Sequence, residues 1–320
     1  SLERARVSLD VRDPAASQLE IELTVRAETD LSEIELFWVD AVEVKSASLE
    51  DGKVEFTSRK IPGAAAKAWT FRLPSSLSSG ASAALSLSAD LRGSAGSSIR
   101  VGEDGGHLLP GAGWFPAADP WSDALVAHST QIQLPEGMTG IACGVRTSTD
   151  GPWTATNPAR PFAAWGRFYH DEVGEGDSRT GIYRRPERQG DVPQLARIER
   201  VIEALEVALG EPCGSGQWTF VDVGHGILDG GQRTVFWDEA LFTQGAGAEE
   251  GVSLEVRDLA GAIASSFWTE CLRFRGELAA WLSRAIALYL GDVACLASYP
   301  DYNDDMELLV IGSRRSEFLA

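Results

Sequence analysis

The sequence predicts an α+β protein in which a β-rich N-terminal domain precedes a domain of mixed strands and helices. Apolar and polar residues alternate with a period of two along the first half, and apolar residues recur at helical spacing along the second half. A chain of 320 residues suits two domains of ordinary size, each with its own core. The apolar content of 44%, with ten Trp, is that of a globular protein.

The strand signals begin near the N-terminus. Apolar side chains alternate with polar ones over 19–25, which predicts a strand with one buried face and one wet face. The same period recurs over 34–38, 54–56 and 85–91, and strand signals resume at 131–134 and 141–145. The Gly/Ser-rich stretches 75–82 and 93–98 are typical of connections between strands.

A helix is predicted before residue 210. Asp191 fits the N-cap, Pro193 fits the first turn, and Gly210 ends the pattern. Between them a single apolar stripe recurs at helical spacing: Leu195, Ile198, Ile202, Leu205 and Leu209.

Two strands and two more helices follow this helix. Strands are expected at 218–223 and 234–237, with a loop around Asp229 between them. Helices are expected over 259–268 and 281–290, and the first aligns three apolar residues at helical spacing: Leu259, Ile263 and Phe267. A polar loop at 300–305 follows the last helix.

Charge and hydropathy exclude several kinds of partner. The net charge of −19 argues against a nucleic-acid surface, because such affinity comes mainly from Lys and Arg neutralising phosphates, and it argues equally against anionic membranes. No apolar run approaches the roughly 20 residues that span a bilayer, and no signal-like start is visible. The first residue, Ser1, suggests a piece of a longer polypeptide, and the sequence does not indicate a compartment.

The four cysteines, Cys143, Cys213, Cys271 and Cys295, are far apart and form no C-x-x-C pair. Neither a metal knuckle nor a redox motif is therefore indicated, and we interpret them as scattered thiols. Cys271 falls on the apolar side of its expected helix, where cysteine behaves as a small hydrophobic residue.

Histidines offer one candidate metal site. None of the four pairs with another at helical spacing, so a helix with two His ligands is excluded. Asp222, His225 and Asp229 fall within eight positions and form the nucleus of a rival hydrolase or metal site. Short Asp/His clusters beside glycines more often make loop hydrogen bonds than bind metals, so we rank this site below the structural interpretation.

Two other motifs fail on inspection. The loop at 301–305 begins like a calcium-binding EF-hand, but Met306 stands where the turn needs Gly and Gly312 where a bidentate Glu is required. Residues 213–217 read CGSGQ, which differs from the G-x-S-x-G elbow of hydrolases and lacks its strand and helix context.

The two last helices carry a resemblance to a known family. Residues 259–268 read LAGAIASSFW and residues 281–290 read WLSRAIALYL. They resemble, without a gap, the helices apolar-H-E-L-A-H-Q-W-aromatic and W-L-N-E-G-F-A-T-Y-L of the zinc aminopeptidase N family, which are gluzincin peptidases. The resemblance places Gly261 and Ser265 at the two His ligands of zinc, Ala262 at the catalytic Glu, and Arg284 at the third ligand, a Glu.

These replacements remove the chemistry that the resemblance implies. Zinc is held by thiolate, imidazole or carboxylate, and Gly261, Ser265 and Arg284 offer none of these groups. The guanidinium of Arg284 also repels a divalent cation. Without the metal no water is acidified, and with Ala262 in place of the Glu no general base remains. We therefore expect no cofactor and no bound metal.

Shorter segments extend the resemblance over most of the chain. Residues 226–230, GILDG, are similar to the strand motif G-x-M-E-N, whose Glu receives the amino group of a substrate, so that Asp229 retains a shortened carboxylate. The segments 114–120 and 210–212 resemble the family's W-Y-P…D-x-P and F-G-x-Y-P motifs.

The family layout implies the domain organisation. It predicts a saddle- or sandwich-like β domain over 1–183 and a truncated thermolysin-like peptidase domain over 184–320. Family members continue well past the third ligand, so the Tyr that stabilises the tetrahedral intermediate and the C-terminal helical domain are expected to be absent.

The resemblance predicts a pseudopeptidase, a non-catalytic binding or structural module that lies within a larger protein and has a protein or peptide partner. Two alternatives stay open: a receptor for peptide N-termini built on Asp229, and a hydrolase built on Asp222, His225 and Asp229. Arg284 itself has two interpretations. Either it pairs with an acid such as Glu270 or Asp229, or it receives the carboxylate of a ligand, and we favour the pairing.

Overall fold

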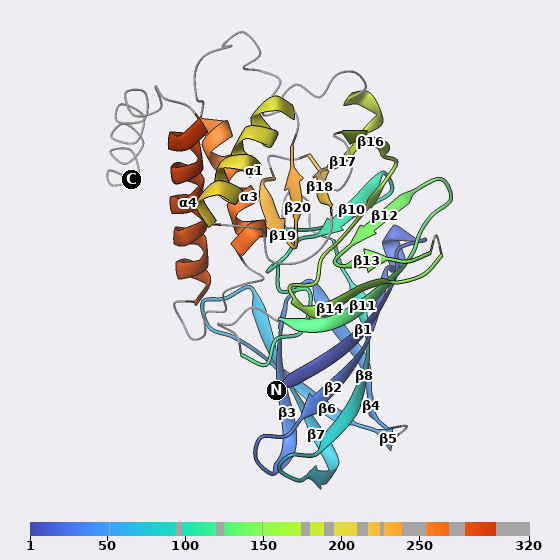
Figure 1. The fold of residues 1–320 in the computed structure, drawn as a ribbon. Coiled ribbons are helices and arrows are strands. Elements are labelled where there is room, and N and C mark those ends of the chain that lie inside the picture. Colours follow the sequence, from blue (N-terminus) through green and yellow to red (C-terminus); the bar gives the residue numbers. More distant parts are fainter. Residues whose placement is uncertain are drawn as a thin grey trace. The chain divides into compact units, whose positions relative to one another are not determined.

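The computed structural model describes residues 1–50, 52–93, 98–119, 125–148, 150–173, 180–188, 195–209, 217–224, 227–238, 254–268 and 279–298. They form two compact units. The first comprises the described residues of Ser1–Phe168 with the first two residues of helix α4, and the second comprises those of Tyr169–Arg273 and Trp281–Ala320. Strands build the first unit, and the α-helices gather in the second (Figure 1).

An eight-stranded sheet dominates the first unit, in the order β13-β14-β11-β1-β2-β8-β4-β5. All its pairs are antiparallel except β1 with β11. Its strands are β1 (Leu2–Asp10), β2 (Gln18–Arg26), β4 (Val42–Leu49), β5 (Gly52–Lys53), β8 (Ser82–Leu91), β11 (Val126–Gln133), β13 (Val145–Arg146) and β14 (Trp153–Ala159), and a short 3-10 turn, Pro14–Ala16, links β1 to β2.

Two smaller sheets complete this unit. The order β3-β7-β6 joins β3 (Leu31–Val39), β7 (Ala66–Leu77) and β6 (Glu55–Lys60), and the order β12-β15-β10-β9 joins β12 (Thr139–Ala142), β15 (Ala163–Gly166), β10 (Gly105–Leu108) and β9 (Ile99–Gly102). The connection expected over 75–82 is therefore wrong in part, because β7 continues to Leu77 and β8 begins at Ser82. Pairing with β3, where Leu31 faces Leu77, keeps this polar stretch extended.

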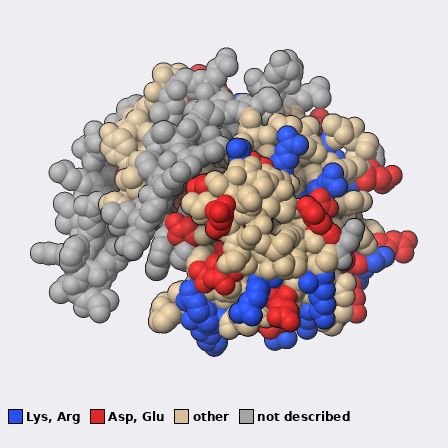
Figure 2. Space-filling model, turned by 90° about the horizontal axis from the view of Figure 1, so that it is seen from below, with Lys and Arg blue, Asp and Glu red and all other residues tan. Residues whose placement is uncertain are grey.

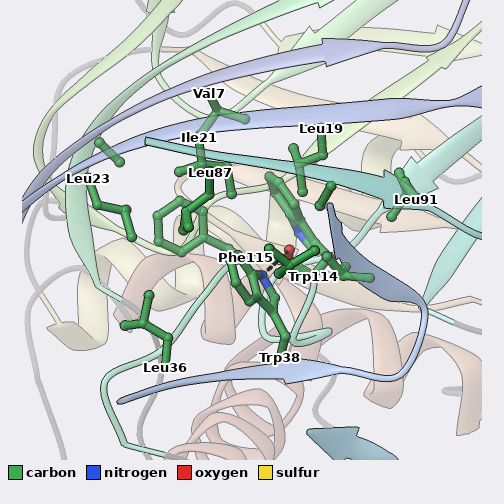
Figure 3. Packing of buried hydrophobic residues seen from close by; sticks show 14 of the residues in the cluster. Val7, Leu19, Ile21, Leu23, Leu36, Trp38, Leu87, Leu91, Trp114 and Phe115 are labelled. Atoms are coloured by element: carbon green, nitrogen blue, oxygen red, sulfur yellow. Dashed lines mark hydrogen bonds between the residues drawn. The ribbon is translucent and has the colours of Figure 1, made fainter. Parts of the chain in front are cut away.

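The predicted alternation produces the core of the first unit. Leu19, Ile21 and Leu23 of β2 are buried, while the Glu residues between them are exposed, as the period of two requires. Figure 3 shows these side chains around Trp38 and Trp114, and the Trp38 indole Nε1 donates a hydrogen bond to the Trp114 carbonyl over 3.0 Å. The aromatic segment at 114–116 thus belongs to this core.

Charges of both signs alternate on the surface of the first unit. Arg59 of β6 forms an ion pair with Glu35 of β3 at 2.8 Å, across the intervening strand β7, and Lys67 of β7 forms one with Glu43 of β4, in the eight-stranded sheet, at 2.6 Å. Figure 2 shows Lys and Arg side chains interspersed with Asp and Glu on one face of the molecule. Ion pairs that remain open to solvent add modestly to stability.

The second unit is a five-stranded mixed sheet with helices. Its order is β16-β17-β18-β20-β19, in which β17, β18 and β20 are parallel and the outer strands antiparallel. The strands are β16 (Tyr169–Val173), β17 (Thr180–Arg184), β18 (Trp218–Asp222), β19 (Asp229–Gly231) and β20 (Thr234–Trp237). The helices are a 3-10 turn (Pro186–Arg188), α1 (Leu195–Leu209), α3 (Leu254–Trp268) and α4 (Ala279–Ser298).

Helices and sheet of the second unit share one core. Ile198, Val201 and Leu205 of α1 pack with Leu259 and Ile263 of α3 and with the buried strands. The predicted stripe of α1 is therefore confirmed where it is described. The expected cap and ends, Asp191, Pro193 and Gly210, lie outside the described residues.

The structure divides the chain earlier than the family layout implies. Strands β16 and β17 pair with each other, and β17 pairs with β18, so these strands belong to the second sheet. Ile182 is fully buried in the second core. The division falls between Phe168 and Tyr169, whereas the boundary at Tyr183 would separate β17 from its sheet.

Candidate functional site

The two helices on which the resemblance places the zinc ligands are both present. Helix α3 spans the expected 259–268 and starts five residues earlier, at Leu254, and α4 spans 281–290 and continues to Ser298. Leu259 and Ile263 are buried as the helical spacing requires, and the side chain of Phe267 lies outside the described ones. Apolar periodicity supported the prediction of the first helix, whereas the second was predicted from the resemblance.

Gly261, at the first ligand position, faces helix α4. A Cβ atom built on it would lie 3.2 Å from Leu288 Cδ2, closer than a comfortable carbon–carbon contact. The resembled motif has Thr where this chain has Leu288. The larger side chain on α4 thus fills the space that a side chain at position 261 would enter.

Ala262 and Ser266 face the sheet instead. Ala262 is buried, and its carbonyl oxygen lies against Gly230 of β19 so closely that a Cβ at position 230 would overlap it. The Ser266 hydroxyl contacts two carbonyl oxygens, Thr234 at 3.0 Å and Ala262 at 3.1 Å. The backbone of α3 at position 262, where the resembled family carries its general base, therefore packs against β19, and the Ala262 side chain is buried. Ser266 was missed from the sequence, although a lone polar residue on an apolar face was the available signal.

Ser265 and Arg284 occupy the other two ligand positions. Ser265 is half-buried on α3, and Arg284 is exposed on α4. Among the residues that the structure describes, no carboxylate lies within ion-pair distance of Arg284. The expected pairing with Asp229 is thus not observed, and Glu270 lies outside the described residues.

Asp229 begins strand β19 and does not lie in a loop, which corrects the sequence expectation. Its half-buried carboxylate accepts a hydrogen bond from the Gly230 backbone N–H at 2.8 Å. Pairing of Asp229 with Phe236 of β20 holds this short strand at the edge of the sheet. The carboxylate lies on the strand that the G-x-M-E-N resemblance predicts, one residue before Gly230, whose backbone packs against α3.

Asp222 belongs to an ion cluster centred on Arg185, which the sequence did not reveal. Its fully buried carboxylate accepts hydrogen bonds from Arg185 Nε at 3.0 Å and from the Gly224 backbone N–H at 3.2 Å. Arg185 also lies 3.4 Å from Glu187 and 3.6 Å from Asp238. Burial opposes the charge of Arg185, but the hydrogen bond and charge of Asp222 with the other two carboxylates outweigh it, so the pKa of Arg185 is raised. The guanidinium stays protonated.

This cluster bears on the rival metal site. The carboxylate of Asp222 is directed to Arg185, and His225 lies outside the described residues. In the described part of the chain, no group of three or more His, Cys, Asp or Glu residues is arranged to hold a metal ion. The structure therefore does not assemble Asp222, His225 and Asp229 into a site that can be described.

None of the helices within the described residues combines the length and apolar character that crossing a bilayer requires. Of the four cysteines, Cys143 and Cys295 are buried and form no disulfide, in line with the interpretation as scattered thiols, whereas Cys213 and Cys271 lie outside the described residues.

Comparisons with known proteins locate the fold. No protein-family model matches the sequence, and no curated protein matches it. Solved structures do match. The M1 zinc metallopeptidase from Deinococcus radiodurans superposes with a TM-score of 0.67 at 16% identity, over 93% of this chain and 71% of that one. Native yeast LTA4 hydrolase superposes with a TM-score of 0.69 at 14% identity, over 97% of this chain and 51% of that one. Legionella pneumophila aminopeptidase A, in complex with aspartic acid, superposes with a TM-score of 0.68 at 12% identity, over 92% of this chain and 37% of that one.

The chain thus has the fold of the M1 zinc metallopeptidases, with a β-rich N-terminal unit followed by a peptidase-like unit. At sequence identities of 12–16%, the similarity establishes the fold and no further property of this chain. Chemistry has to be argued from the residues at the site.

Proposed function

We propose that this protein is a pseudopeptidase: a peptidase-like scaffold that binds a protein or peptide partner and does not cleave peptide bonds. One observation carries the proposal. At the three positions equated with zinc ligands, Gly261, Ser265 and Arg284 provide no thiolate, imidazole or carboxylate.

The surroundings of these positions support the same conclusion. A Cβ atom at position 261 would lie 3.2 Å from Leu288 Cδ2, and the methyl side chain of Ala262 is buried and offers no basic group. Arg284 supplies a positive charge at the third position, where a metal site requires a donor atom. A hydrolytic zinc site needs its ligands, an open coordination position and a base, and the aligned positions provide no ligand and no base.

Metal analysis and an activity assay test the proposal together. We expect purified protein to contain less than stoichiometric zinc after dialysis against zinc, and to release no product from aminoacyl fluorophores. Arg284→Ala should behave in the same way, because removing the positive charge supplies no ligand. Stoichiometric zinc accompanied by hydrolysis that chelators abolish would refute the pseudopeptidase assignment.

A second candidate function is a receptor for peptide N-termini. Asp229 keeps a carboxylate at the position that the resemblance equates with the amine-binding Glu, and its side chain is half-buried, so part of it is open to solvent. Two solved structures with this fold hold L-tryptophan and L-arginine, free amino acids that each carry an α-amino group. A carboxylate–ammonium contact of this kind is a charge-assisted hydrogen bond.

Calorimetric titration decides between receptor and inert scaffold. We expect di- and tripeptides with a free N-terminus to bind the wild-type protein more tightly than Asp229→Asn, which keeps the shape and removes the charge. N-acetylated peptides serve as matched controls. Equal affinity of both proteins for the free peptides would dismiss Asp229 as the binding group.

Nucleic acids and anionic membranes are not among the partners that we propose. The net charge of −19 disfavours association with either polyanion, most strongly at low ionic strength.

A further inference from the structure

Helices α3 and α4 approach more closely than apolar side chains usually allow. A Cβ atom built on Gly291 of α4 would lie 2.6 Å from the Gly261 backbone nitrogen and 2.9 Å from the Gly261 Cα. Both of these are backbone atoms, which cannot move aside as a side chain can. The two backbones are therefore in direct contact, and only glycine fits at position 291.

An ion pair lies beside this contact. Arg257 of α3 donates from Nη2 to Asp292 Oδ2 at 3.0 Å, and its Nε donates to the other carboxylate oxygen. The side chains are only 21% and 31% exposed, so water screens this two-point contact less than it screens a surface pair.

The four residues lie on facing sides of the two helices. Arg257 and Gly261 are separated by four positions on α3, and Gly291 and Asp292 are adjacent on α4. Gly261 also contacts Leu288, so earlier residues of α3 meet later residues of α4. The helices therefore run in opposite directions where they cross.

We propose that Arg257, Gly261, Gly291 and Asp292 form a helix clasp that joins α3 to α4 without a metal ion. In the resembled enzymes the zinc ligands come from both of these helices, so the metal itself connects them. Here the contact between Gly261 and Gly291 brings the two helices close together, and the ion pair between Arg257 and Asp292 fixes the direction and the register of one helix against the other. The inference goes beyond the proposed function, because the clasp acts whether or not the protein binds a peptide.

A buried thiol one turn beyond Gly291 offers a direct readout of the clasp. Cys295 is fully buried, and burial together with the negative charge of Asp292 raises the pKa of its thiol to about 12, although Arg257 acts in the opposite direction. Its thiol is therefore protected while the helices stay together. Cys143, buried in the first unit, provides an internal control within the same molecule.

The test is site-resolved alkylation of the full chain with N-ethylmaleimide, read by peptide mass spectrometry. We expect Arg257→Ala, Asp292→Ala and Gly291→Ala each to increase the labelling rate of Cys295 by about tenfold or more, since each promotes local opening, and to leave Cys143 unchanged. In the double variant Arg257→Ala/Asp292→Ala, Cys295 should label no faster than in the faster-labelling of the two single variants. The exchanged pair Arg257→Asp/Asp292→Arg should recover part of the protection of Cys295. Glu206→Ala and Ala297→Leu, at exposed positions of α1 and α4, are the matched controls and should label as wild type does.

Two results would overturn the clasp. Unchanged Cys295 labelling in all three single variants would show that other contacts hold the helices. Faster labelling of the wild-type protein after treatment with a chelator would show that a metal holds them. Zinc binding accompanied by hydrolysis would refute the proposed function, but it would not change the labelling rates expected for the variants. A failure of the proposed function can therefore be distinguished from a failure of the clasp.

Discussion

At the scale of single residues, the difference between a glycine and a side chain decides what position 261 can do. Its missing Cβ leaves room for Leu288, and the neighbouring Gly291 brings the helix backbones together. A histidine at position 261 would therefore have to push aside the half-buried side chain of Leu288.

Rebuilding the zinc site tests that argument. We expect Gly261→His/Ser265→His/Arg284→Glu to bind zinc weakly and to lose thermal stability, because the new imidazole overlaps Leu288. Adding Leu288→Thr should relieve the overlap and increase zinc affinity by about tenfold or more, in line with the cost of overpacking of about 1–3 kcal/mol. Competition with a zinc chelator measures both affinities, and equal affinities would contradict the packing argument.

Gly224 is a second position at which an added Cβ atom would disturb the structure. Its φ of +67° is in the left-handed region, and a Cβ atom there would lie 2.7 Å from the Arg185 guanidinium. Gly224→Ala should therefore destabilise the protein by about 1–3 kcal/mol, through backbone strain and displacement of Arg185 from Asp222. Chemical denaturation provides the measurement. Gly80→Ala, whose φ of +82° is similar but whose Cβ would meet nothing within 4 Å, separates strain from displacement.

At the scale of elements, regular periodicity predicted most strands and helices, and pairing partners changed the exceptions. Strand β20 has the expected bounds of 234–237, because an apolar run between turn residues leaves little freedom. Strand β7 runs through Pro74 and two serines that predict a connection, because pairing with β3 outweighs their low strand propensity. The strand character of Asp229–Gly231 likewise comes from β20, since two glycines carry no strand signal.

We expect His128 of strand β11 to make the first unit sensitive to acid. His128 is buried, its Nδ1 donates to the Val126 carbonyl at 2.8 Å, and its Nε2 has no hydrogen-bond partner among the residues that the structure describes. Burial lowers the pKa of His128, and the Val126 hydrogen bond opposes this only in part. Because the folded pKa lies below the unfolded value of about 6.5, this contribution to stability is complete above that pH and decreases as the pH falls through it toward the folded pKa.

The measurement is the free energy of unfolding of the wild-type protein and of His128→Gln between pH 8 and pH 5. We expect the wild-type protein to lose more stability than the variant over this range, because the amide cannot take up a proton. Parallel pH profiles would contradict the assignment of acid sensitivity to His128.

At the scale of the whole molecule, the chain consists of two units with separate cores. The larger core includes Leu9, Leu23, Trp38, Phe71 and Trp114, all within the first unit. The second core draws on Ile182 and on the helices. Each unit should therefore hold its own structure without help from the other core.

Truncation tests this division. We expect a fragment of residues 1–168 to unfold cooperatively and to stay monomeric. A fragment of residues 1–183 should be less soluble, because it carries β17 without β18 and exposes Ile182. Circular dichroism and light scattering distinguish the two. A fragment 1–168 without cooperative unfolding would show that the first unit depends on the second.

Local pattern by itself determined most strands and helices of this protein and the chemistry that each side chain can offer, because periodicity and residue type are properties of the chain at each position. Only tertiary structure decided where those residues lie. The contacts of Gly261 with Leu288 and Gly291, and of Arg185 with Asp222, join segments about 30 or more positions apart. Such contacts depend on how helices and strands pack, and no local spacing encodes them.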